Sequence, residues 1–585
     1  MIVPMQKLLV AVRRSDRETL LTALRDAGVI HLVPVDPERA RVDDETSAQL
    51  RDAERALQVL SALEPQGDRP TVEPGEIVAE VHSIQRRAAE HQSRLTGLYR
   101  QLEQIRMWGD LRLKQLEQLQ KAGLNVEFFA LPAESLGEIK AECVHSLGEL
   151  QSKQTMVAVV QRSGEAELPE SAVPLQLPST DAPTIRAEAA EIDVAQKADQ
   201  ARLAQLAHLS IEVEQELARV RQEADWTLAL NGASEDENLF AVQGWIPEGH
   251  ADEALTKLAA SGMAAMKTIP ADEDELPPTL IESPKWARPI EGLFGVLGTV
   301  PGYREFDVSI PFLIALPLFT AMLISDAAYG AILLFGPALT YPWASKAFGV
   351  RFTQLLMVVG AVSMVWGTLT NAFFGFPVFE KAVITVGTQD AAIQFMMELS
   401  FTIGAIHLSL AQLWQAVRFF PDLRFFSKIG WAVFIWGMYG VVKFFVLKSP
   451  MTMETPWPYL LMVGATLAIL FASPSTNPLR MVGMGLAQFP LSMLSAFSDV
   501  MSYVRLMAVG LASSVLAVSF NNLALDAGFW PLTVIILLFG HSLNMGLGLI
   551  AMFAHGVRLN MLEFGNNLGL EWTGYAFSPF AQHSE

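Results

Sequence analysis

The 585-residue chain has a single cysteine, Cys143, and charged residues are sparse in its second half. One cysteine excludes a disulfide framework and a metal site built from cysteine ligands. Of its 42 Lys and Arg residues, 12 lie after residue 300, as do 13 of its 62 Asp and Glu residues. The first 300 residues are therefore acidic, which argues against nucleic acid as a partner.

Two sequence patterns are also missing. No G-x-x-x-x-G-K-[S/T] loop occurs in the chain, so we do not expect it to hydrolyse ATP by itself. The stretch MIVPMQKLLVAVRRSD lacks the basic, apolar and small-residue order of a signal peptide. We expect the acidic half to stay in the cytoplasm, and we expect no cofactor and no bound metal.

The N-terminus has the pattern of a strand–helix–strand unit. Residues 6–11 predict a strand, and Ser15 with Glu18 predicts a capping box for the helix that follows. The apolar face of this helix comprises Leu20, Leu21 and Leu24. Gly28 is expected to end it, and residues 29–35 predict a second strand.

A similar unit is predicted much later in the chain. Residues 239–246 are strand-like, 250–261 have a helical pattern that Gly262 is expected to stop, and 263–269 return as a strand. We expect the two units to pack together as one α/β lobe.

Between these units, apolar residues recur at spacings of three and four, as in coiled coils. The two series are Ile84, Ala88, His91, Leu95, Leu98, Leu102 and Ile105, and Leu206, Ser210, Val213, Leu217, Val220 and Ala224. Residues 125–180 interrupt them with strand-like and Pro-rich sequence. The pattern favours a dumbbell, an antiparallel hairpin of long helices with a lobe at each end, over a helical bundle without lobes.

The second half contains apolar spans long enough to cross a bilayer. They cover about 310–341, 353–374, 392–418, 428–447, 457–472, 484–520 and 529–564. Loops with excess Lys and Arg should be cytoplasmic, and this holds only if the first span crosses twice and turns near Asp326. The last two spans exceed the ~20 residues that a perpendicular crossing needs, so we expect them to tilt or extend.

The predicted organisation is thus an α+β cytoplasmic domain (1–270), a Pro-rich acidic linker (271–308) and an all-α membrane domain (309–585). The cytoplasmic domain would comprise the first lobe, the coiled-coil hairpin, a distal lobe at 125–180 and the return to the first lobe. The membrane domain would have about eight transmembrane helices, with both chain ends inside.

Arg505 and Arg558 are the cations placed well inside the predicted spans. A charge at the bilayer centre costs at least ~2.5–3.5 kcal/mol and usually faces protein or water on an ion path. Polar or small residues at spacings of three and four accompany both: Ser495, Ser498 and Ser502, and His541, Asn544, Gly548, Ala551 and His555. The alternative is that both arginines form internal pairs with buried acids such as Asp499 or Glu563.

Four other polar residues have ordinary explanations. His407, Gln412 and Glu398 are expected to be satisfied by a neighbouring helix, and Asp326 is expected at a hairpin turn.

Both arginine segments resemble a known family. SDVMSYVRLMAVGLASSVLA and GHSLNMGLGLIAMFAHGVRLNMLEF resemble the last two membrane helices of subunit a, called subunit I in prokaryotes, of V-type and A-type rotary ATPases. The resemblance covers essentially the whole chain. It extends to YREFD, PLFTAMLISDAAYG, MVWGTLTNAFFG, IGAIHLSLAQ, VQGWIPE and DELPPTLIESPKWARPIE.

The resemblance implies a membrane stator that catalyses nothing itself. Such a subunit forms proton or Na⁺ half-channels against a proteolipid rotor ring and anchors peripheral stalks, in a prokaryotic cell membrane. It implies that Arg505 is the main stator arginine and Arg558 its partner. The half-channel candidates are His541, Asn544, His555, Glu563, Ser498, Asp499 and Ser502.

The chain also departs from the family. SDAAYG replaces a common GDAGYG, which puts a close helix contact there in doubt. Gly548 and Ser513 stand where eukaryotic members tend to have a glutamate and a histidine. A secondary transporter with a cytoplasmic coiled-coil regulatory domain is the main alternative function; it would need an internal repeat, and none is evident. A sensor or scaffold would leave the arginine segments unexplained, and the sequence leaves the choice of H⁺ or Na⁺ open.

Overall fold

The computed structural model describes residues 1–149, 154–162, 166–251, 256, 265–272, 274–384, 386–387, 389–475 and 477–581. These residues form two compact units. One unit comprises Met1–Val33 with Glu237–Ala581, and the other comprises Pro34–Asp236.

An antiparallel sheet in the first unit joins the two ends of the predicted cytoplasmic domain. Its order is β2-β8-β1-β9, with β1 at Met5–Arg13, β2 at His31–Val33, β8 at Leu239–Pro247 and β9 at Ala265–Pro270. Met5 lies opposite Pro247, and the pairing continues to Arg13 opposite Leu239. Leu8, Val10 and Val12 alternate with more exposed residues and are buried, as the two-residue period of a strand requires. The predicted strands and their packing as one lobe are confirmed.

The helix α1 (Arg17–Ala27) buries Leu20, Leu21 and Leu24 and ends at Gly28, which has a positive φ of 62°. The capping-box prediction is wrong, because Asp16 is the N-cap residue and the Ser15 hydroxyl donates to the Asp16 carboxylate instead. The predicted helix 250–261 and its stop at Gly262 lie mostly outside the described residues.

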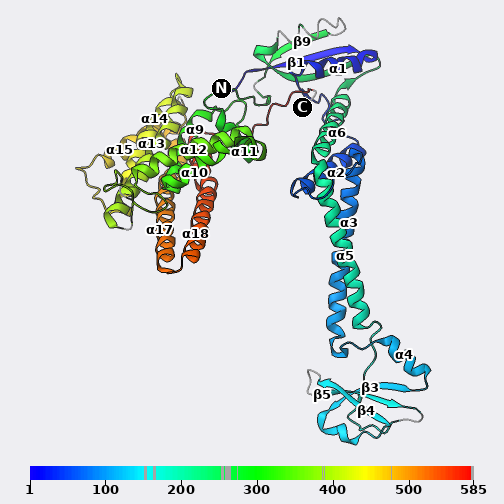
Figure 1. Ribbon diagram of the computed structural model, residues 1–585. Coiled ribbons are helices and arrows are strands. Elements are labelled where there is room, and N and C mark those ends of the chain that lie inside the picture. Colours follow the sequence, from blue (N-terminus) through cyan, green and yellow to red (C-terminus); the bar gives the residue numbers. More distant parts are fainter. Residues whose placement is uncertain are drawn as a thin grey trace. The chain divides into compact units, whose positions relative to one another are not determined.

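The second unit contains long helices. They are α2 (Asp44–Ser61), α3 (Pro74–Gln104), α4 (Leu113–Lys121), α5 (Ala182–Leu206) and α6 (Ser210–Asn231). α3 and α5 lie side by side (Figure 1). They run antiparallel: along the ion pairs that join them, residue numbers rise on α3 and fall on α5. These pairs are Glu80–Arg202, Arg87–Asp199 and Arg94–Glu188.

A second sheet of order β4-β5-β3-β6 occurs between α4 and α5. Its strands are β3 (Asn125–Pro132), β4 (Cys143–Glu149), β5 (Gln154–Gln161) and β6 (Val173–Pro174). The buried apolar side chains on one face of this sheet are Phe129 and Leu131 of β3 and Val157 and Val159 of β5. A helical bundle without lobes is therefore the wrong description of this half.

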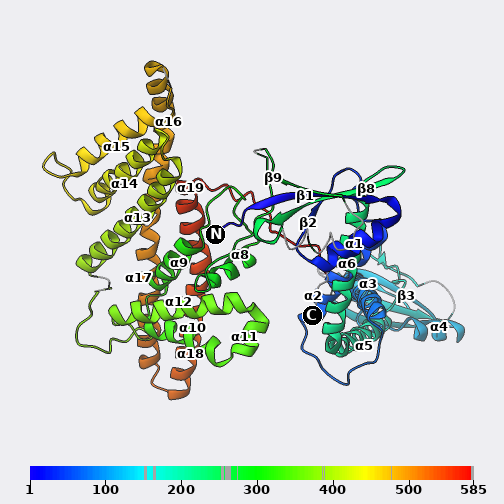
Figure 2. The same cartoon turned by 90° about the horizontal axis from the view of Figure 1, so that it is seen from above.

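Apolar helices make up most of the remaining chain (Figure 2). Among the described residues, five helical segments are long and apolar enough to cross a membrane: Val350–Leu369 (α12), Asp390–Phe419 (α13), Arg424–Leu447 (α14), Pro478–Asp526 and Trp530–Leu568. Shorter apolar helices are α9 (Ser309–Ile324), α10 (Ala327–Leu339) and α15 (Trp457–Phe471). The first predicted span thus consists of two short helices.

The last two long segments are less regular than their sequence pattern suggests. The first divides into α16 (Pro478–Ser502) and α17 (Val504–Asp526) at Tyr503. The second begins as α18 (Trp530–Ala551) and continues as π-helical turns at Met552–Val557 and Leu559–Phe564 before the short α19 (Gly565–Leu568). Wider π turns break the spacing of three and four that the sequence continues from His541 to Arg558.

Candidate functional site

Arg505 lies in the first turn of α17, directly after the break at Tyr503. Its Nε donates to the carbonyl oxygen of Ser502 at 2.9 Å, which is one of the carbonyls left free where α16 ends. The Tyr503 ring is fully buried, and its hydroxyl lies 2.7 Å from Nδ1 of His407 on α13. At the break between α16 and α17, Tyr503 therefore packs against α13, and the Ser502 carbonyl accepts a hydrogen bond from the Arg505 guanidinium.

Glu563 joins the two arginines. Its Oε1 lies 2.5 Å from Nη2 of Arg505 and 3.6 Å from Nε of Arg558. Only 4% of the Glu563 side chain is exposed, against 20% for Arg505 and 56% for Arg558. One buried carboxylate thus faces two guanidinium groups, and Arg558 keeps more than half of its surface accessible.

Further polar side chains extend this cluster towards α13 and α16. Nδ2 of Asn567 donates to Oδ2 of Asp499 at 2.7 Å and to the Glu563 carbonyl at 2.8 Å. Its Oδ1 accepts from Nε2 of Gln412 at 2.9 Å. We call Arg505, Arg558, Glu563, Asn567 and Asp499 the arginine cluster.

His541 and Asn544 lie in a separate buried network nearer the turn between α17 and α18. His541 is hydrogen-bonded to Tyr329 on α10 and to Asn521 on α17. Asn544 is hydrogen-bonded to Tyr329 and to Ser513. We call these five residues the outer network.

The remaining candidates are less tightly placed. Ser498 is exposed on α16, and Ser502 contributes its backbone carbonyl to Arg505. His555 is half-buried in the first π turn, and its Nδ1 has no hydrogen-bond partner among the described residues. The structure thus brings Asp499, Ser502, Glu563 and both arginines together, and separates them from His541 and Asn544.

The chain matches proteins of one kind along its full length. It is 27% identical to the V-type ATP synthase subunit I of Borreliella burgdorferi, with 99% of both chains covered. It is 28% identical to V-type ATP synthase subunit I 1 of Treponema pallidum, with 100% of both covered. The chain is thus similar, over its full length, to subunit I proteins of V-type ATP synthases.

Other proteins named subunit I match part of the chain at lower identity. The A-type ATP synthase subunit I of Methanocaldococcus jannaschii is 24% identical, with 60% of this chain and 56% of the relative covered. Among solved structures, a cytoplasmic N-terminal domain of subunit I, homolog of subunit a, of V-ATPase covers 45% of this chain with 19% identity and a TM-score of 0.19. No protein-family model matches the chain.

The helices that carry the arginines are the least covered of the long apolar segments within the described residues. In the most apolar window of the two arginine-bearing segments, 28% and 22% of the residues are buried, against 39–50% for the other three. Both figures show α17 and α18 side by side (Figures 1 and 2). Their exposed side chains are mostly large and apolar, including Val518, Leu538, Phe539, Leu547 and Ile550. A large apolar surface of this kind fits lipid or another membrane subunit.

Sequence reasoning missed four residues of the arginine cluster and the outer network, namely Asn567, Tyr329, Ser513 and Asn521. Asn567 follows Glu563 by four positions, so the helical spacing offered a signal for it. Tyr329 and Asn521 come from other helices, and no spacing within α18 indicates them. The expectations for Glu398 and Asp326 agree with the structure, since Glu398 pairs with Lys443 and Asp326 caps α10. His407 and Gln412 are satisfied in part: each makes one hydrogen bond to another helix, and His407 Nε2 and Gln412 Oε1 have no partner among the described residues.

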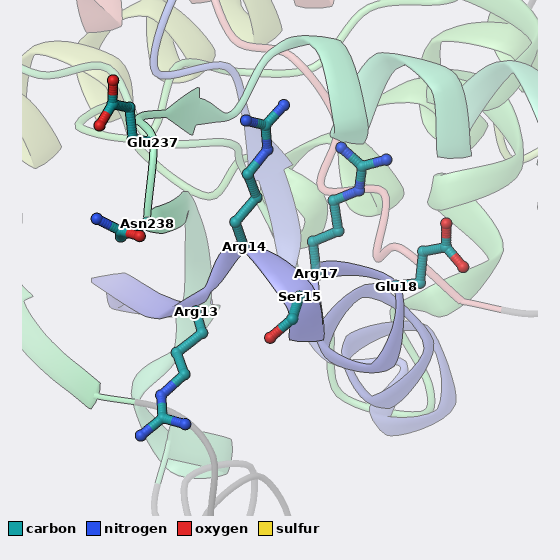
Figure 3. Close-up of a pocket in the computed structure, with 7 residues that line it drawn as sticks. All are labelled: Arg13, Arg14, Ser15, Arg17, Glu18, Glu237 and Asn238. Atoms are coloured by element: carbon teal, nitrogen blue, oxygen red, sulfur yellow. The ribbon is translucent and has the colours of Figure 1, made fainter.

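A surface pocket in the β1–β8 sheet region is rich in arginine but is not built like an anion site. It is lined by Arg13, Arg14, Ser15, Arg17, Glu18, Glu237 and Asn238. Figure 3 shows Arg13 extending away from Arg14 and Arg17, so the three guanidinium groups do not converge on one point.

Proposed function

We propose that the chain is the membrane stator of a V-type or A-type rotary ATPase and that the arginine cluster faces the rotor ring. One observation carries this proposal. Arg505 on α17 and Arg558 between the two π-helical turns both contact the buried carboxylate of Glu563, and the segments that carry them are the least covered of the long apolar segments described. Full-length similarity to subunit I proteins supports it.

The chemistry follows from fixed charge in a medium of low dielectric. A carboxylate that a rotor subunit brings next to Arg505 is stabilised in its ionised form, because an opposite charge nearby favours that form. The rotor carboxylate must then give up its proton or Na⁺ at this position. The same cation opposes direct leakage of ions past the stator.

Glu563 gives Arg505 a counter-charge within the chain itself. The internal-pair alternative is thus part of the geometry. Two guanidinium groups share Glu563, the second carboxylate of the cluster, Asp499, is bonded to Asn567 instead, and Arg558 is more than half exposed. We infer that a rotor carboxylate competes with Glu563 for Arg505 as it passes.

The half-channel candidates fall on two sides of Arg505 along the helices. Asp499, Ser498 and Ser502 precede it, and we assign them with Glu563 and His555 to the inner half-channel. His541 and Asn544 lie on α18, and their partners Asn521 and Ser513 follow Arg505 on α17, so we assign them to the outer one. This requires the eight crossings that the loop charges predict, with α9 and α10 as a short pair.

We assign the mechanical role to the N-terminal domain, which is cytoplasmic. The domain boundaries 1–270, 271–308 and 309–585 remain our proposal. The ion pairs between α3 and α5 support a stiff coiled-coil arm, with the sheet β4-β5-β3-β6 as its distal lobe. We infer that this dumbbell-shaped domain holds peripheral stalk subunits against the torque of the rotor. The membrane in which it works would be the inner membrane of a prokaryote.

Replacement of Arg505 by alanine tests the function. In the assembled ATPase, reconstituted into vesicles, R505A should reduce ATP-driven ion uptake to background while the subunits stay together. Subunit content after affinity purification is the assembly measurement, and Arg424→Ala, at the exposed start of α14, is the matched control. Ion uptake by R505A at the rate of the unchanged complex would refute the proposal.

A further inference from the structure

We propose that the short helix α11 (Tyr341–Phe348) lies at the surface of the bilayer and binds the headgroup of an anionic phospholipid. Two side chains form the site, the indole of Trp343 and the ammonium group of Lys346. The inference uses the membrane topology of the proposed function, which places α11 on the cytoplasmic side, but it does not depend on the arginine cluster.

The helix α11 joins two apolar helices that pack against each other. It follows α10 after Thr340 and leads through Gly349 into α12 (Figure 2). With 20 residues, α12 is about 30 Å long, which is the thickness of the hydrocarbon layer of a bilayer. The residues that directly precede α12 therefore belong at the edge of that layer, where the lipid headgroups begin.

One face of α11 is held against α12. Ala344 is buried, and the Tyr341 hydroxyl accepts a hydrogen bond from Nε2 of Gln354 on α12 at 3.3 Å. The Ser345 hydroxyl donates to the Tyr341 carbonyl within the helix. The polar groups on this face thus have partners inside the chain, and the helix has a fixed inner side.

The outer side of α11 exposes large apolar side chains. Trp343 is 66% exposed and Phe348 is 52% exposed, and their rings lie edge to face with 6.0 Å between the centroids. Leu339 before the helix and Val350 after it are exposed as well. Exposed apolar surface of this kind is unfavourable in water, and tryptophan is enriched where a bilayer meets water. The pattern therefore fits a helix that lies on the lipid.

The charge on this side of α11 is positive. Lys346 and Arg351 are the only charged residues from 327 to 379. Nε of Arg351 lies 3.7 Å from a carboxylate oxygen of Glu291, so this cation already has a counter-charge. The Lys346 ammonium group has no ion-pair or hydrogen-bond partner among the described residues. An anion supplied from outside the chain is therefore its complement.

Trp343 and Lys346 together match the parts of one lipid headgroup. Lys346 follows Trp343 by three positions, which makes the two side chains neighbours on the helix surface. The ammonium group attracts the phosphate, and the indole N–H donates a hydrogen bond to a phosphate or ester oxygen. In phosphatidylcholine the choline cation offsets the phosphate charge, so a headgroup with a net negative charge fits this site better.

The test attaches a fluorescent reporter next to this site in the complete ATPase in vesicles. Ala347→Cys, at an exposed position of α11, is introduced together with Cys143→Ser and labelled with a thiol-reactive dye. The complex with Cys143→Ser alone, labelled in the same way, gives the background from other subunits. The vesicles contain phosphatidylcholine and phosphatidylglycerol in a constant ratio. The same small amount of brominated lipid, which quenches the dye on contact, is supplied as one or the other.

We expect quenching to show phosphatidylglycerol enriched roughly fivefold over phosphatidylcholine at the reporter, as one basic residue at a bilayer surface gives, and Lys346→Gln to bring the ratio to about one. Met462→Cys on α15 is the matched control site. It is exposed, and no Lys or Arg occurs from 449 to 479, so both lipids should quench a reporter there equally. Subunit content after purification shows that each variant complex is assembled.

Equal quenching by the two lipids at Ala347→Cys overturns the preference for an anionic headgroup. A reporter that neither lipid quenches overturns the lipid contact itself and indicates that water or another subunit covers α11. An enrichment that Lys346→Gln leaves unchanged also overturns the site. Ion uptake by the R505A complex is measured separately, so a failure of the stator function and a failure of the lipid site give different results.

Discussion

A single carboxylate determines the electrostatics of the arginine cluster. Glu563 is almost fully buried and lies within 2.5 Å of Arg505, while Arg558 approaches the same oxygen at 3.6 Å. Its second oxygen, Oε2, has no hydrogen-bond partner among the described residues. A buried charge that has lost its water costs free energy unless an opposite charge pairs with it. Glu563 and the two arginines therefore depend on one another for pairing.

Replacement of Glu563 by glutamine should therefore destabilise the membrane domain. E563Q removes the carboxylate that contacts both guanidinium groups, and we expect a loss of about 3 kcal/mol, at the lower end for a broken buried pair because Arg505 is partly exposed. Thermal unfolding of the purified complex in detergent measures this loss. Glu571→Gln, at an exposed site, is the control. Equal melting temperatures for E563Q and E571Q would contradict the pairing.

At the scale of elements, glycine lets two apolar helices meet backbone to backbone. A Cβ added to Gly360 on α12 would lie 2.4 Å from the backbone nitrogen of Leu334 on α10. One added to Gly330 on α10 would lie 2.3 Å from the nitrogen of Met364. The close contact that SDAAYG placed in doubt therefore exists, because Gly330 is retained within that motif.

Gly360→Ala should separate α10 from α12. The neighbouring atoms are backbone and cannot turn aside, so we expect the mutation to cost about 1–3 kcal/mol of stability, as overpacking does. Gly336→Ala is the matched control on α10, where an added Cβ meets nothing within 4 Å, and it should be neutral or stabilising by about 0.5–1 kcal/mol. Thermal unfolding compares the two. If G360A melts no earlier than G336A, the helices are not in backbone contact.

The sequence was sufficient for elements whose pattern is local. The strands of the lobe, the helix ended by Gly28 and the division of the first apolar span at SDAAYG all follow from alternation, spacing and turn residues. The break at Tyr503 and the π turns after Ala551 did not follow. They depend on contacts with other helices, such as the Tyr503 ring against Gly404 and its hydroxyl on His407.

The same limit applies to the candidate site. Arg505, Arg558, Glu563 and Asp499 could be named from charge placed in apolar sequence. Their grouping around Asn567, and the separation of His541 from them, depend on helices that are distant in sequence. Periodicity assigns a residue to a face of its own helix, but it does not say which other helix covers that face.

At the scale of the first unit, the C-terminal segment ties the N-terminal sheet to the linker. Ala576 pairs with Thr279, and Gly574 pairs with Val300. Farther along, the N–H of Ser578 donates to Nδ1 of His31 at 3.0 Å, and that of Phe580 donates to the Ile30 carbonyl at 2.7 Å. The segment thus links the strand β2 with the residues that lead into α9.

This link should weaken in acid. The Ser578 bond requires an unprotonated Nδ1, and burial lowers the pKa of His31 below its ordinary value of 6.5, so the ring is neutral at pH 7.5. Its contribution is complete above pH 6.5 and is lost as the pH falls through the lowered pKa. Tyr575, whose ring lies 5.6 Å from the His31 ring, stays neutral because burial raises its pKa.

Hydrogen exchange of residues 574–581 measures the effect. Between pH 7.5 and 5.5, after correction for intrinsic exchange, protection should fall roughly fivefold, corresponding to about 1 kcal/mol for one lost hydrogen bond. His31→Asn supplies an amide oxygen that does not titrate, so its protection should not change between the two pH values. A fall of the same size in H31N would place the pH sensitivity elsewhere, since the asparagine cannot gain the proton that displaces the Ser578 N–H.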